Sequence, residues 1–293
     1  MADDKEILLL LHQGPVILLQ LQGPSLYQHS RIIYTQEKGV IVLAYAIITG
    51  ASKGLGAAAA KQLLSEGLKV ISVSRSENVD LKEIDQKGSG EYTHYSCDLG
   101  SPSEVKSVFT KIAGMVFQER GEEVYLINNA GMVDPIETAG NLDVEKTETH
   151  VNVNMLSPMI ISNLFLNKAD TSDARLVIAN ISSGAGSRPV HGWSIYCSTK
   201  AAINMFTQTT ALELDNRKSH HRVFAFSPGI MDTDMQSTIR SSSKSAFNDI
   251  ETFKNYKEEG KLRDAETVAG ALVNVLKSDE IENGKIYQIN DLL

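Results

Sequence analysis

Tyr196 and Lys200 form a pair of side chains whose types and spacing suit acid–base chemistry. A separation of four residues places both side chains on one face of a helix. A phenol has an ordinary pKa of about 10, and a neighbouring ammonium group lowers that pKa by favouring the phenolate. Such a pair can therefore exchange a proton near neutral pH. The spacing alone is not specific, because Tyr34 and Lys38 repeat it.

The surroundings of Tyr196 distinguish it from the tyrosine of the second pair. Residues 194–215 have the pattern of a helix, and they follow an apolar run at 175–181 that is typical of a strand. This run leads into Ser183, which lies thirteen positions before Tyr196. The other tyrosine has no such strand and serine before it. Ser183, Tyr196 and Lys200 are therefore candidates for one site.

Short apolar runs rich in β-branched residues alternate with longer helical segments from residue 42 to the end of the chain. The runs that predict strands are 42–49, 69–74, 91–97, 124–128, 175–181, 221–226 and 285–289. The segments that predict helices are 54–66, 101–118, 144–168, 194–215 and 265–277. This alternation predicts an α/β fold with a doubly wound parallel sheet, a Rossmann fold, in a single domain over 42–293.

Residues 1–41 do not share this pattern. Their apolar runs, 7–11 and 16–21, are far shorter than the ~18–20 apolar residues that span a bilayer. Their acidic start also differs from the basic start of a secretory signal. We interpret 1–41 as a disordered or loosely packed extension. The alternative hypothesis is an over-extended reading frame whose true start is Val42 or Leu43.

The composition of the 293 residues excludes some function classes. The net charge of -8 argues against general binding of nucleic acid, which requires a basic surface. The two cysteines, Cys97 and Cys197, form no disulfide framework or metal motif, which fits a reducing cytoplasm. The histidines are scattered apart from His220 and His221, which we interpret as part of a solvated turn rather than as metal ligands.

Gly50, Gly54 and Gly56 follow the first strand of the α/β pattern and precede its first helix. Glycine lets the backbone turn tightly and approach a pyrophosphate, and the helix N-terminus offers unpaired N–H groups to it. A glycine pattern alone is weak, but its place between a strand and a helix predicts dinucleotide binding. The residues expected to contact the cofactor here are Gly50, Ser52, Lys53, Gly54, Leu55 and Gly56.

The end of the second strand indicates which dinucleotide is bound. NAD sites place a carboxylate there for the ribose 2′-hydroxyl, whereas this strand ends without an acid and leads into Arg75. Arg75 and Lys53 suit a 2′-phosphate, which predicts NADPH, unless both are ordinary surface bases. Asp98, with Leu99 beside it, is expected to accept a hydrogen bond from the adenine amino group. The alternative for Asp98 is a helix-capping role.

These residues occur in the order that is typical of the short-chain dehydrogenase/reductase family, which the chain resembles from residue 42 to the C-terminus. The motifs that carry the resemblance are Thr49-Gly50 with Gly54-Leu55-Gly56, Asn128-Asn129-Ala130-Gly131, Ser183 with Tyr196 and Lys200, and Ser227-Pro228-Gly229. The resemblance implies hydride transfer from a nicotinamide to a carbonyl carbon, with Tyr196 giving the proton to the oxygen. It also implies that Ser183 binds the substrate oxygen and that Lys200 holds the ribose hydroxyls.

The same resemblance implies further site residues. The fourth catalytic residue matches Asn154, which is expected to anchor a water in the proton relay. Asn152 is the alternative, but it faces elsewhere on a helix. The segment Asn128-Asn129-Ala130-Gly131 is expected to brace the central sheet and border the adenosine ribose, with Asn129, Ala130 and Gly131 as cofactor contacts. The loop expected to meet the nicotinamide carboxamide contributes Pro228, Gly229, Ile230 and Thr233.

Within the family, the chain resembles sepiapterin-reductase-like enzymes and, in particular, bacterial benzil reductases that form benzoin. The segments that carry this likeness are Ser183-Gly184-Ala185-Gly186, Gly192-Trp193-Ser194-Ile195-Tyr196-Cys197, Met231-Asp232-Thr233-Asp234-Met235-Gln236, Ile239-Arg240-Ser241-Ser242 and Asn283-Gly284-Lys285-Ile286-Tyr287. Trp193, Met132, Met231 and Met235 could line an apolar substrate pocket, although each is equally typical of core packing.

The resulting hypothesis is a cytoplasmic, NADPH-dependent carbonyl reductase that converts a ketone or a benzil-like 1,2-diketone to an alcohol or 2-hydroxy ketone. The alternatives are a non-catalytic NADP-binding regulator on the same fold and an oxidative alcohol dehydrogenase. The expected partner is a small-molecule carbonyl compound, with no nucleic acid, metal or membrane. A homo-oligomer is expected, and a dimer is favoured, because the paired glycine usual near the family's C-terminus is missing.

Overall fold

The structure is a computed structural model that describes residues 7–11, 14–18, 44–86, 90–118 and 123–293. The chain divides into two compact units, Met1–Arg31 and Ile32–Leu293. The described part of the first unit is an antiparallel hairpin of β1 (Ile7–Leu11) and β2 (Gly14–Leu18). The domain boundary at residue 42 and the alternative start there lie outside the described residues, so both stay predictions.

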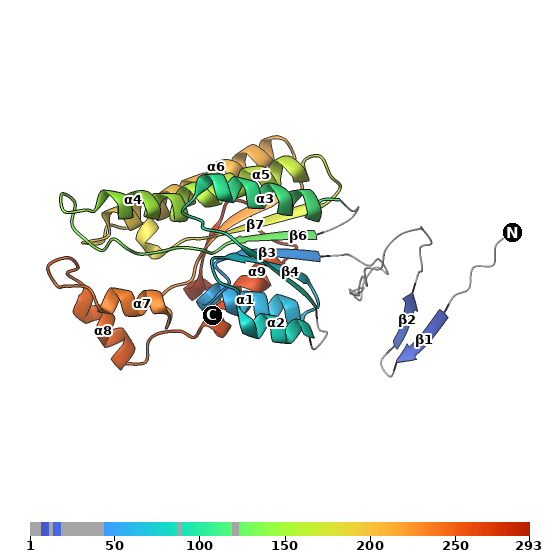
Figure 1. Cartoon of the computed structure of the whole chain (residues 1–293), viewed down its shortest axis with the longest axis horizontal. Helices are drawn as coiled ribbons and strands as arrows, with labels where there is room; N and C mark the ends of the chain where they lie inside the picture. Colours follow the sequence, from blue (N-terminus) through green and yellow to red (C-terminus); the bar gives the residue numbers. More distant parts are fainter. Residues whose placement is uncertain (1–6, 12–13, 19–43, 87–89, 119–122) are drawn as a thin grey trace. The chain divides into compact units, whose positions relative to one another are not determined.

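The second unit is built on a seven-stranded parallel sheet with the strand order β5-β4-β3-β6-β7-β8-β9 (Figure 1). The strands are β3 (Ala44–Thr49), β4 (Lys69–Ser74), β5 (Glu91–Ser96), β6 (Glu123–Asn128), β7 (Arg175–Ile181), β8 (Arg222–Ser227) and β9 (Ile286–Gln288). The chain runs outward from β3 to β5 and then, from β6, outward in the opposite direction. The predicted doubly wound Rossmann sheet is confirmed.

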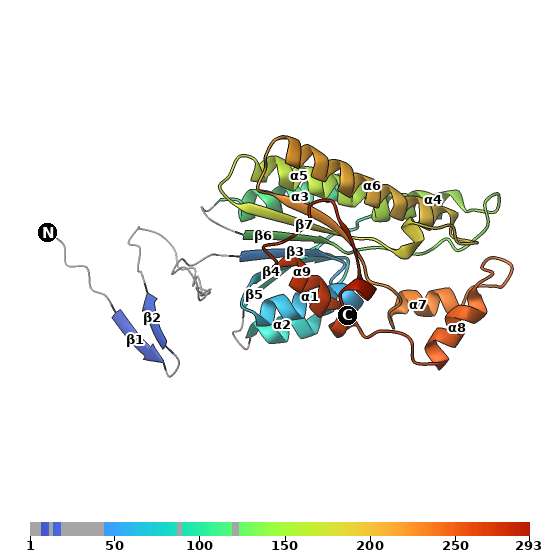
Figure 2. The same ribbon diagram turned by 180° about the vertical axis from the view of Figure 1, so that it is seen from behind.

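Helices cover both faces of this sheet (Figures 1 and 2). One face carries α3 (Pro102–Val116), α4 (Val144–Val151), α5 (Ser157–Ala169) and α6 (Ser194–Asn216). The other face carries α1 (Gly54–Ser65), α2 (Val79–Gln86) and α9 (Ala265–Leu276). No helix in the described ranges combines the length and the apolar character that crossing a membrane requires.

The alternation of side chains along each strand produces the two layers of the core. Successive strand residues point to opposite faces of a sheet. Ile48 and Ile127 therefore pack in the cluster under α1 and α9, whereas Ile47 and Leu126 pack in the cluster under α3, α5 and α6. Because both faces are covered, both sets are fully buried.

The long helix expected at 144–168 is present but not uniform. Its middle, Asn152–Leu156, is a π-helical turn between α4 and α5, and Pro158 lies in the first turn of α5. Proline has no N–H to donate to the preceding turn, and a π turn is a place where the regular i→i−4 hydrogen bonds are already interrupted. Such single π turns are frequent at functional sites.

The sequence patterns missed three short helices in the described ranges, which are α2, α7 (Asp234–Arg240) and α8 (Ile250–Glu258). Each has fewer than ten residues, so its apolar periodicity is too short to distinguish it from a loop. Helices α7 and α8 contact each other beside the sheet, between β8 and α9 in the chain (Figures 1 and 2).

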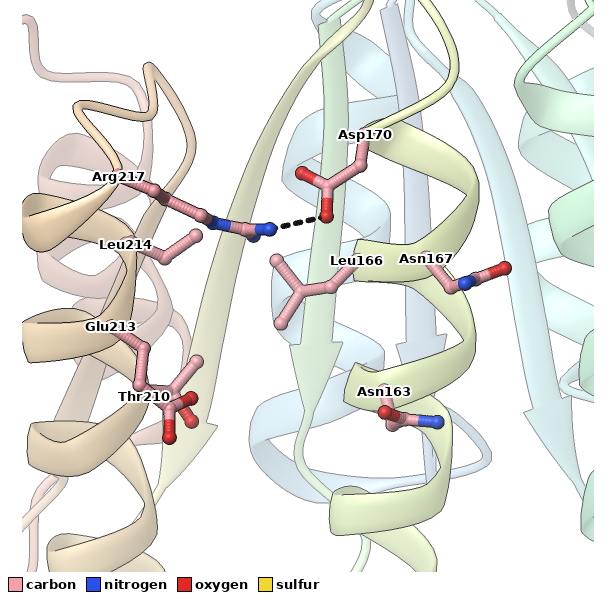
Figure 3. A pocket seen from close by; sticks show the side chains of 8 residues that line it. All are labelled: Asn163, Leu166, Asn167, Asp170, Thr210, Glu213, Leu214 and Arg217. Atoms are coloured by element: carbon pink, nitrogen blue, oxygen red, sulfur yellow. Dashed lines mark hydrogen bonds and ion pairs between the residues drawn. The ribbon is translucent and has the colours of Figure 1, made fainter.

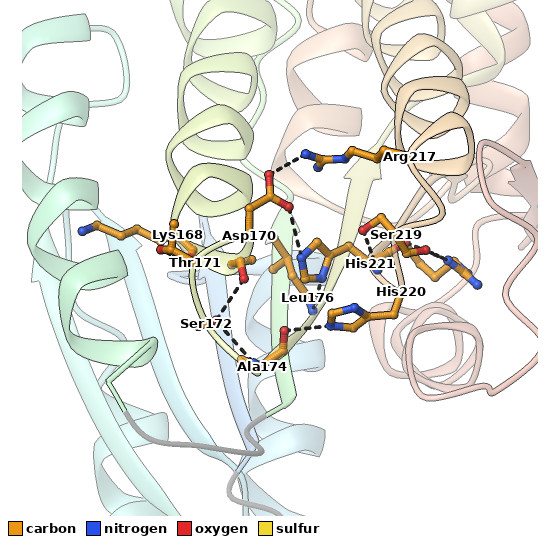
Figure 4. A network of polar contacts seen from close by, with 12 residues as sticks. Lys168, Asp170, Thr171, Ser172, Ala174, Leu176, Arg217, Ser219, His220 and His221 are labelled. Atoms are coloured by element: carbon orange, nitrogen blue, oxygen red, sulfur yellow. Dashed lines mark hydrogen bonds and ion pairs between the residues drawn. The ribbon is translucent and has the colours of Figure 1, made fainter.

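A polar network links the C-terminal ends of α5 and α6 (Figure 4). Arg217 donates to Asp170 at 2.5 Å, and His221 Nε2 lies 3.5 Å from the same carboxylate. The prediction of a solvated turn at 220–221 is wrong for His221, which is 1% exposed. Pairing of β7 with β8 brings His221 against Leu176, whose N–H lies 3.3 Å from His221 Nδ1. Burial lowers the pKa of His221 to about 4, so the ring is neutral at pH 7.

A groove lies next to this network, between α5 and α6 (Figure 3). Its α6 side begins at Thr210, which is about 20 Å along the helix from Tyr196 at a rise of about 1.5 Å per residue. The groove is therefore separate from the predicted catalytic residues. Among the described residues, no three His, Cys, Asp or Glu side chains gather in a way that could hold a metal ion.

Candidate active site

The predicted cofactor loop lies between β3 and α1 and packs against the end of β6. Asn129 donates from Nδ2 to Thr49 O at 2.9 Å, and Thr49 Oγ1 accepts from the N–H groups of Asn129 and Ala130 at 3.0 Å. A Cβ at Gly56 would lie 2.4 Å from Asn129 Nδ2, so only glycine fits this contact. Gly50 has a φ of +68°, which glycine adopts without strain.

The N-terminus of α1 is left open for a negatively charged group. Lys53 occupies the N-cap position but forms no side-chain cap, and the first turn contains no acidic residue. The first N–H groups of a helix have no intrahelical partner, and the helix dipole favours an anion there. These features fit the pyrophosphate of a dinucleotide.

The two bases predicted to hold a 2′-phosphate have different surroundings. Arg75 follows β4, is exposed, and forms no side-chain hydrogen bond or ion pair with any described residue. Lys53 donates to Asp234 in the first turn of α7 at 2.6 Å, and both side chains are at least 70% exposed. An exposed ion pair contributes only about 0–1 kcal/mol, so a phosphate can compete for Lys53.

Asp98 lies in the turn after β5 and is exposed. Its carboxylate accepts from Gly100 N–H at 2.9 Å, while Ser101 caps α3 by accepting from Glu104 N–H. The alternative in which Asp98 caps the helix is therefore wrong, because Ser101 occupies that position. Leu99 beside it is buried, and its carbonyl accepts from the hydroxyl of Ser157 at 2.7 Å.

The loop predicted to meet the nicotinamide lies beside the glycine loop. A Cβ at Gly54 would lie 3.6 Å from Thr233 Cγ2, in van der Waals contact. Gly229 has a φ of +71°, and the carbonyl of Ile230 accepts from Arg263 N–H at 3.1 Å. The structure thus brings residues 50–56 and 228–233 together, although they are far apart in the sequence.

Tyr196, Lys200 and Ser183 lie together in one cluster, as the spacing predicted, with Ser183 half-buried. Tyr196 and Lys200 lie in the first two turns of α6 and are 7% and 4% exposed. The Tyr196 hydroxyl is hydrogen-bonded to Ser183, and Lys200 Nζ is 5.8 Å from the centre of the Tyr196 ring. Lys200 also donates to the carbonyl of Ile181 at 2.8 Å, which anchors it at the end of β7.

Burial determines the charge states of this cluster. It raises the pKa of Tyr196 above the ordinary value, and the hydrogen bond with Ser183 opposes the rise only in part. The expected net lowering of this pKa is therefore wrong in direction, because the loss of water dominates the shift. Burial also lowers the pKa of Lys200 to about 8. At pH 7 the phenol is neutral and the ammonium is charged.

Asn154, rather than Asn152, lies beside this cluster. A Cβ at Gly131 would lie 3.5 Å from Asn154 Oδ1 and 3.6 Å from Lys200 Nζ, so all three residues meet at one point. Asn152 points instead to the turn after β5, where it donates to the carbonyl of Gly100 at 3.1 Å. The π-helical turn places these two side chains in different surroundings.

The Asn128–Gly131 segment braces the middle of the sheet, as expected. Asn128 donates to Asn180 on β7 at 2.8 Å and to Ser162 on α5 at 3.1 Å. Asn180 in turn donates to Thr207 on α6 at 2.9 Å. This buried network ties two neighbouring strands to the helices that carry the candidate catalytic residues.

An aromatic cluster packs against Tyr196. Trp193 contacts the Tyr196 ring edge-on at 5.2 Å and stacks on Phe247 at 4.9 Å, and Phe253 covers it at 5.5 Å. The sequence reasoning missed Phe247 and Phe253, which lie just before and within α8. The indole N–H of Trp193 has no hydrogen-bond partner among the described residues.

The four residues expected to line the substrate pocket lie in different parts of the structure. Met235 packs in the same apolar cluster as Trp193 and Tyr196. Met231 packs instead against the core under α1 and α9. Met132 pairs through its backbone with the side chain of Asn154. The structure therefore brings Trp193 and Met235, but not Met231, to the apolar side of Tyr196.

The short chain dehydrogenase family model matches residues 44–244. The chain belongs to the short-chain dehydrogenase/reductase family. It is 39% identical over 248 residues to the (S)-benzoin-forming benzil reductase of Bacillus subtilis, covering 84% of this chain and 98% of that protein. It is 30% identical over 268 residues to the sepiapterin reductase of Rattus norvegicus, covering 87% and 100%. The crystal structure of the KRED1-Pglu enzyme matches with a TM-score of 0.69 and 29% identity, covering 83% and 100%.

Membership in this family confirms the resemblance inferred from the motifs. The chain is an oxidoreductase that acts on carbonyl or CH–OH groups of a small molecule, and its fold binds NAD(P).

Proposed function

We propose that this enzyme is an NADPH-dependent carbonyl reductase for which a 1,2-diketone is a preferred substrate and Tyr196 is the proton donor. The main support is the cluster of Tyr196, Ser183 and Lys200, which packs against Trp193 and lies beside Gly131 of a predicted cofactor segment. Its relatives include benzil reductases that form (S)-benzoin. Both observations favour catalysis over a purely regulatory role.

The residues present fit NADPH. The open N-terminus of α1 suits the pyrophosphate, and Arg75 and Lys53 offer charged donors for a 2′-phosphate. Lys200 uses one N–H on Ile181 O, which leaves two for the nicotinamide ribose hydroxyls. NADPH, when bound, supplies the hydride that reaches the carbonyl carbon.

The chain's own side chains handle the carbonyl oxygen. Tyr196 gives its phenolic proton to that oxygen, so that carbon gains hydride, oxygen gains a proton, and the product is an alcohol. Ser183 donates a hydrogen bond to the same oxygen and stabilises its developing charge. Lys200 stabilises the phenolate that Tyr196 becomes. The phenol of Tyr196 is protonated at neutral pH, because its ordinary pKa is about 10 and burial raises it further, so the proton is available for the carbonyl oxygen.

The apolar surroundings favour an aryl substrate with an activated carbonyl. Trp193 packs edge-on against Tyr196 and is backed by Phe253 and the fully buried Phe247, so the surroundings of Tyr196 on this side are apolar. A neighbouring carbonyl withdraws electrons, so the carbonyl carbon of a 1,2-diketone accepts hydride more readily than that of a simple ketone. Tyr196 and Ser183 hold one oxygen in the reacting position, so the product is a 2-hydroxy ketone.

Benzil with NADPH tests this proposal. We expect a single benzoin enantiomer, because a fixed Tyr196 lets hydride reach only one face of the carbonyl group. We also expect benzoin to form faster than the alcohol from acetophenone, because the second carbonyl of benzil activates the first. Cofactor consumption gives the rate, and chiral chromatography identifies the product. A racemic benzoin, a diol as the first product, or no activity on any diketone would contradict the assignment.

Replacing Arg75 with Asp tests the cofactor preference. We expect KM for NADPH to rise about 10- to 100-fold and the preference to move toward NADH, because a charge-assisted hydrogen bond contributes about 1.5–3 kcal/mol. Steady-state kinetics with both cofactors measure the change. Lys168→Asp is the matched control, because Lys168 is exposed near the C-terminal end of α5. Equal use of NADPH and NADH by the unmodified enzyme would refute the preference.

A further inference from the structure

His150 is a fully buried imidazole for which the proposed reaction has no role so far. It lies in the last turn of α4 and is 0% exposed. Its ring meets the Tyr196 ring edge-on, with centroids 6.0 Å apart. It precedes Asn154 by four residues, so both side chains point toward the same face of the helix. His150 lies before the π-helical turn, and Asn154 lies within it.

Both ring nitrogens of His150 have polar neighbours. Nδ1 lies 2.6 Å from the backbone carbonyl oxygen of Asp134. Nε2 lies 2.8 Å from Asn154 Nδ2 and 3.1 Å from the hydroxyl of Thr199, the residue before Lys200. His150 thus connects the loop after β6, the π-helical turn and the helix that carries the candidate catalytic pair.

The neighbours specify the tautomer of the ring. A carbonyl oxygen only accepts, so Nδ1 carries the proton that goes to Asp134. Asn154 is oriented by a two-way pairing, in which Oδ1 accepts from Met132 N–H at 2.8 Å and Nδ2 donates to Met132 O at 2.7 Å. Its second Nδ2–H therefore points at His150 Nε2, which must offer a lone pair.

We propose that His150, as a neutral imidazole, is a positioning residue that holds the Asn154 amide and, through it, the π-helical turn against Lys200 and Tyr196. This inference rests on the proposed function, because carbonyl reduction is the reaction that it serves. His150 acts through Asn154 and touches no reacting atom. Without the acceptor at Nε2, a buried N–H of Asn154 has no partner, and only the pairing with Met132 still holds the amide beside Lys200.

The charges around His150 keep the ring neutral. Burial and the Lys200 ammonium on α6 lower its pKa, while the carbonyl and carboxylate of Asp134 oppose this only in part. Tyr196, the other titratable group facing the ring, is neutral at pH 7. Protonation would put a second donor at Nε2, directly opposite the Asn154 N–H. We therefore expect kcat for reduction to fall on the acid side as the ring becomes charged.

Two substitutions separate the acceptor from the ring. His150→Phe keeps a planar ring but removes the acceptor, and we expect kcat to fall about 10- to 100-fold, equivalent to about 1.4–3 kcal/mol, with KM nearly unchanged. His150→Gln keeps an acceptor near the place of Nε2, and we expect it to restore kcat to within a few fold and to remove the acid-side fall. His220→Gln, in the turn between α6 and β8, is the matched control that leaves kcat unchanged.

Nitrogen-15 spectra of the unmodified protein test the tautomer without any turnover. We expect the His150 signals of a neutral ring at pH 7, with a proton on Nδ1 and none on Nε2, assigned by their loss in His150→Gln. These spectra also decide the matter if His150→Phe fails to fold. If the unmodified protein reduces no carbonyl compound, the proposed function fails, while the spectra still test His150.

The inference is overturned by any of three results. One is a proton on Nε2 at pH 7, the second is a folded His150→Phe with normal kcat, and the third is an equal loss of kcat in the Phe and Gln variants. Loss of kcat in Phe with recovery in Gln, together with the neutral Nδ1–H tautomer, supports it.

Discussion

Replacing Tyr196 with Phe is expected to lower kcat for carbonyl reduction by about 10²–10⁴-fold, the range typical of lost acid–base catalysis. The change removes only the hydroxyl, which is the group hydrogen-bonded to Ser183. The ring keeps its contacts with Trp193 and His150, so folding and NADPH binding should stay close to those of the unmodified enzyme. Cofactor-consumption kinetics and fluorescence titration with NADPH measure the two quantities.

Tyr95→Phe is the matched control for this change. Tyr95 lies on β5, and its hydroxyl contacts only Met115 among the described residues, at 4.0 Å. Removing that hydroxyl should leave kcat unchanged. If Tyr196→Phe binds NADPH and turns over at a near-normal rate, Tyr196 is not the proton donor.

Replacing Lys200 with Met is expected to abolish most activity and, at the same time, to stabilise the protein. The lowering of the Lys200 pKa from 10.5 to about 8 corresponds to about 3 kcal/mol against the charged side chain in the folded state. Met fills a similar volume without a charge, although it leaves the Ile181 carbonyl without its Lys200 donor. We expect a net gain of about 1–2 kcal/mol in the free energy of unfolding at pH 7.

The pH dependence of this gain follows from the direction of the pKa change. Between pH 8 and 10.5 the unfolded chain keeps a proton that the folded chain has lost, so this group makes the unmodified protein more stable as pH rises. The advantage of Lys200→Met should therefore shrink from pH 7 to pH 10 in urea unfolding. Lys61→Met, at an exposed position on α1, is the control. A Lys200→Met protein that is less stable than the unmodified one at pH 7 would contradict the cost of the buried charge.

Much of the fold and site could be predicted from local patterns. The strand at 69–74 and the strand at 175–181 have the predicted bounds, because an apolar run buried on both sides is a strong local signal. The grouping of Ser183, Tyr196 and Lys200 also follows from spacing, since the helix and the end of the preceding strand leave little freedom. The same holds for the glycine loop, whose place between strand and helix fixes its geometry.

Other features depend on contacts between segments that are distant in the sequence. The π-helical turn is stabilised by Asn154 bonding to Met132 and by Asn152 bonding to Gly100, so no local pattern in 144–168 indicates it. Lys53 pairs with Asp234, which lies 181 residues away. His150 becomes a candidate only when the loop after β6 and helix α6 are both packed around it.

Residue types and spacing thus predicted which side chains the candidate site contains, because helix and strand geometry relate near neighbours in a known way. The tertiary structure decided how those side chains are charged and held. Lys200 was correctly placed near Tyr196 from the sequence, yet the pKa of Tyr196 moves upward, because the loss of solvent depends on what packs around the phenol. Burial and long-range hydrogen bonds depend on how helices and strands from distant parts of the chain pack together, so they can be determined only from the folded structure.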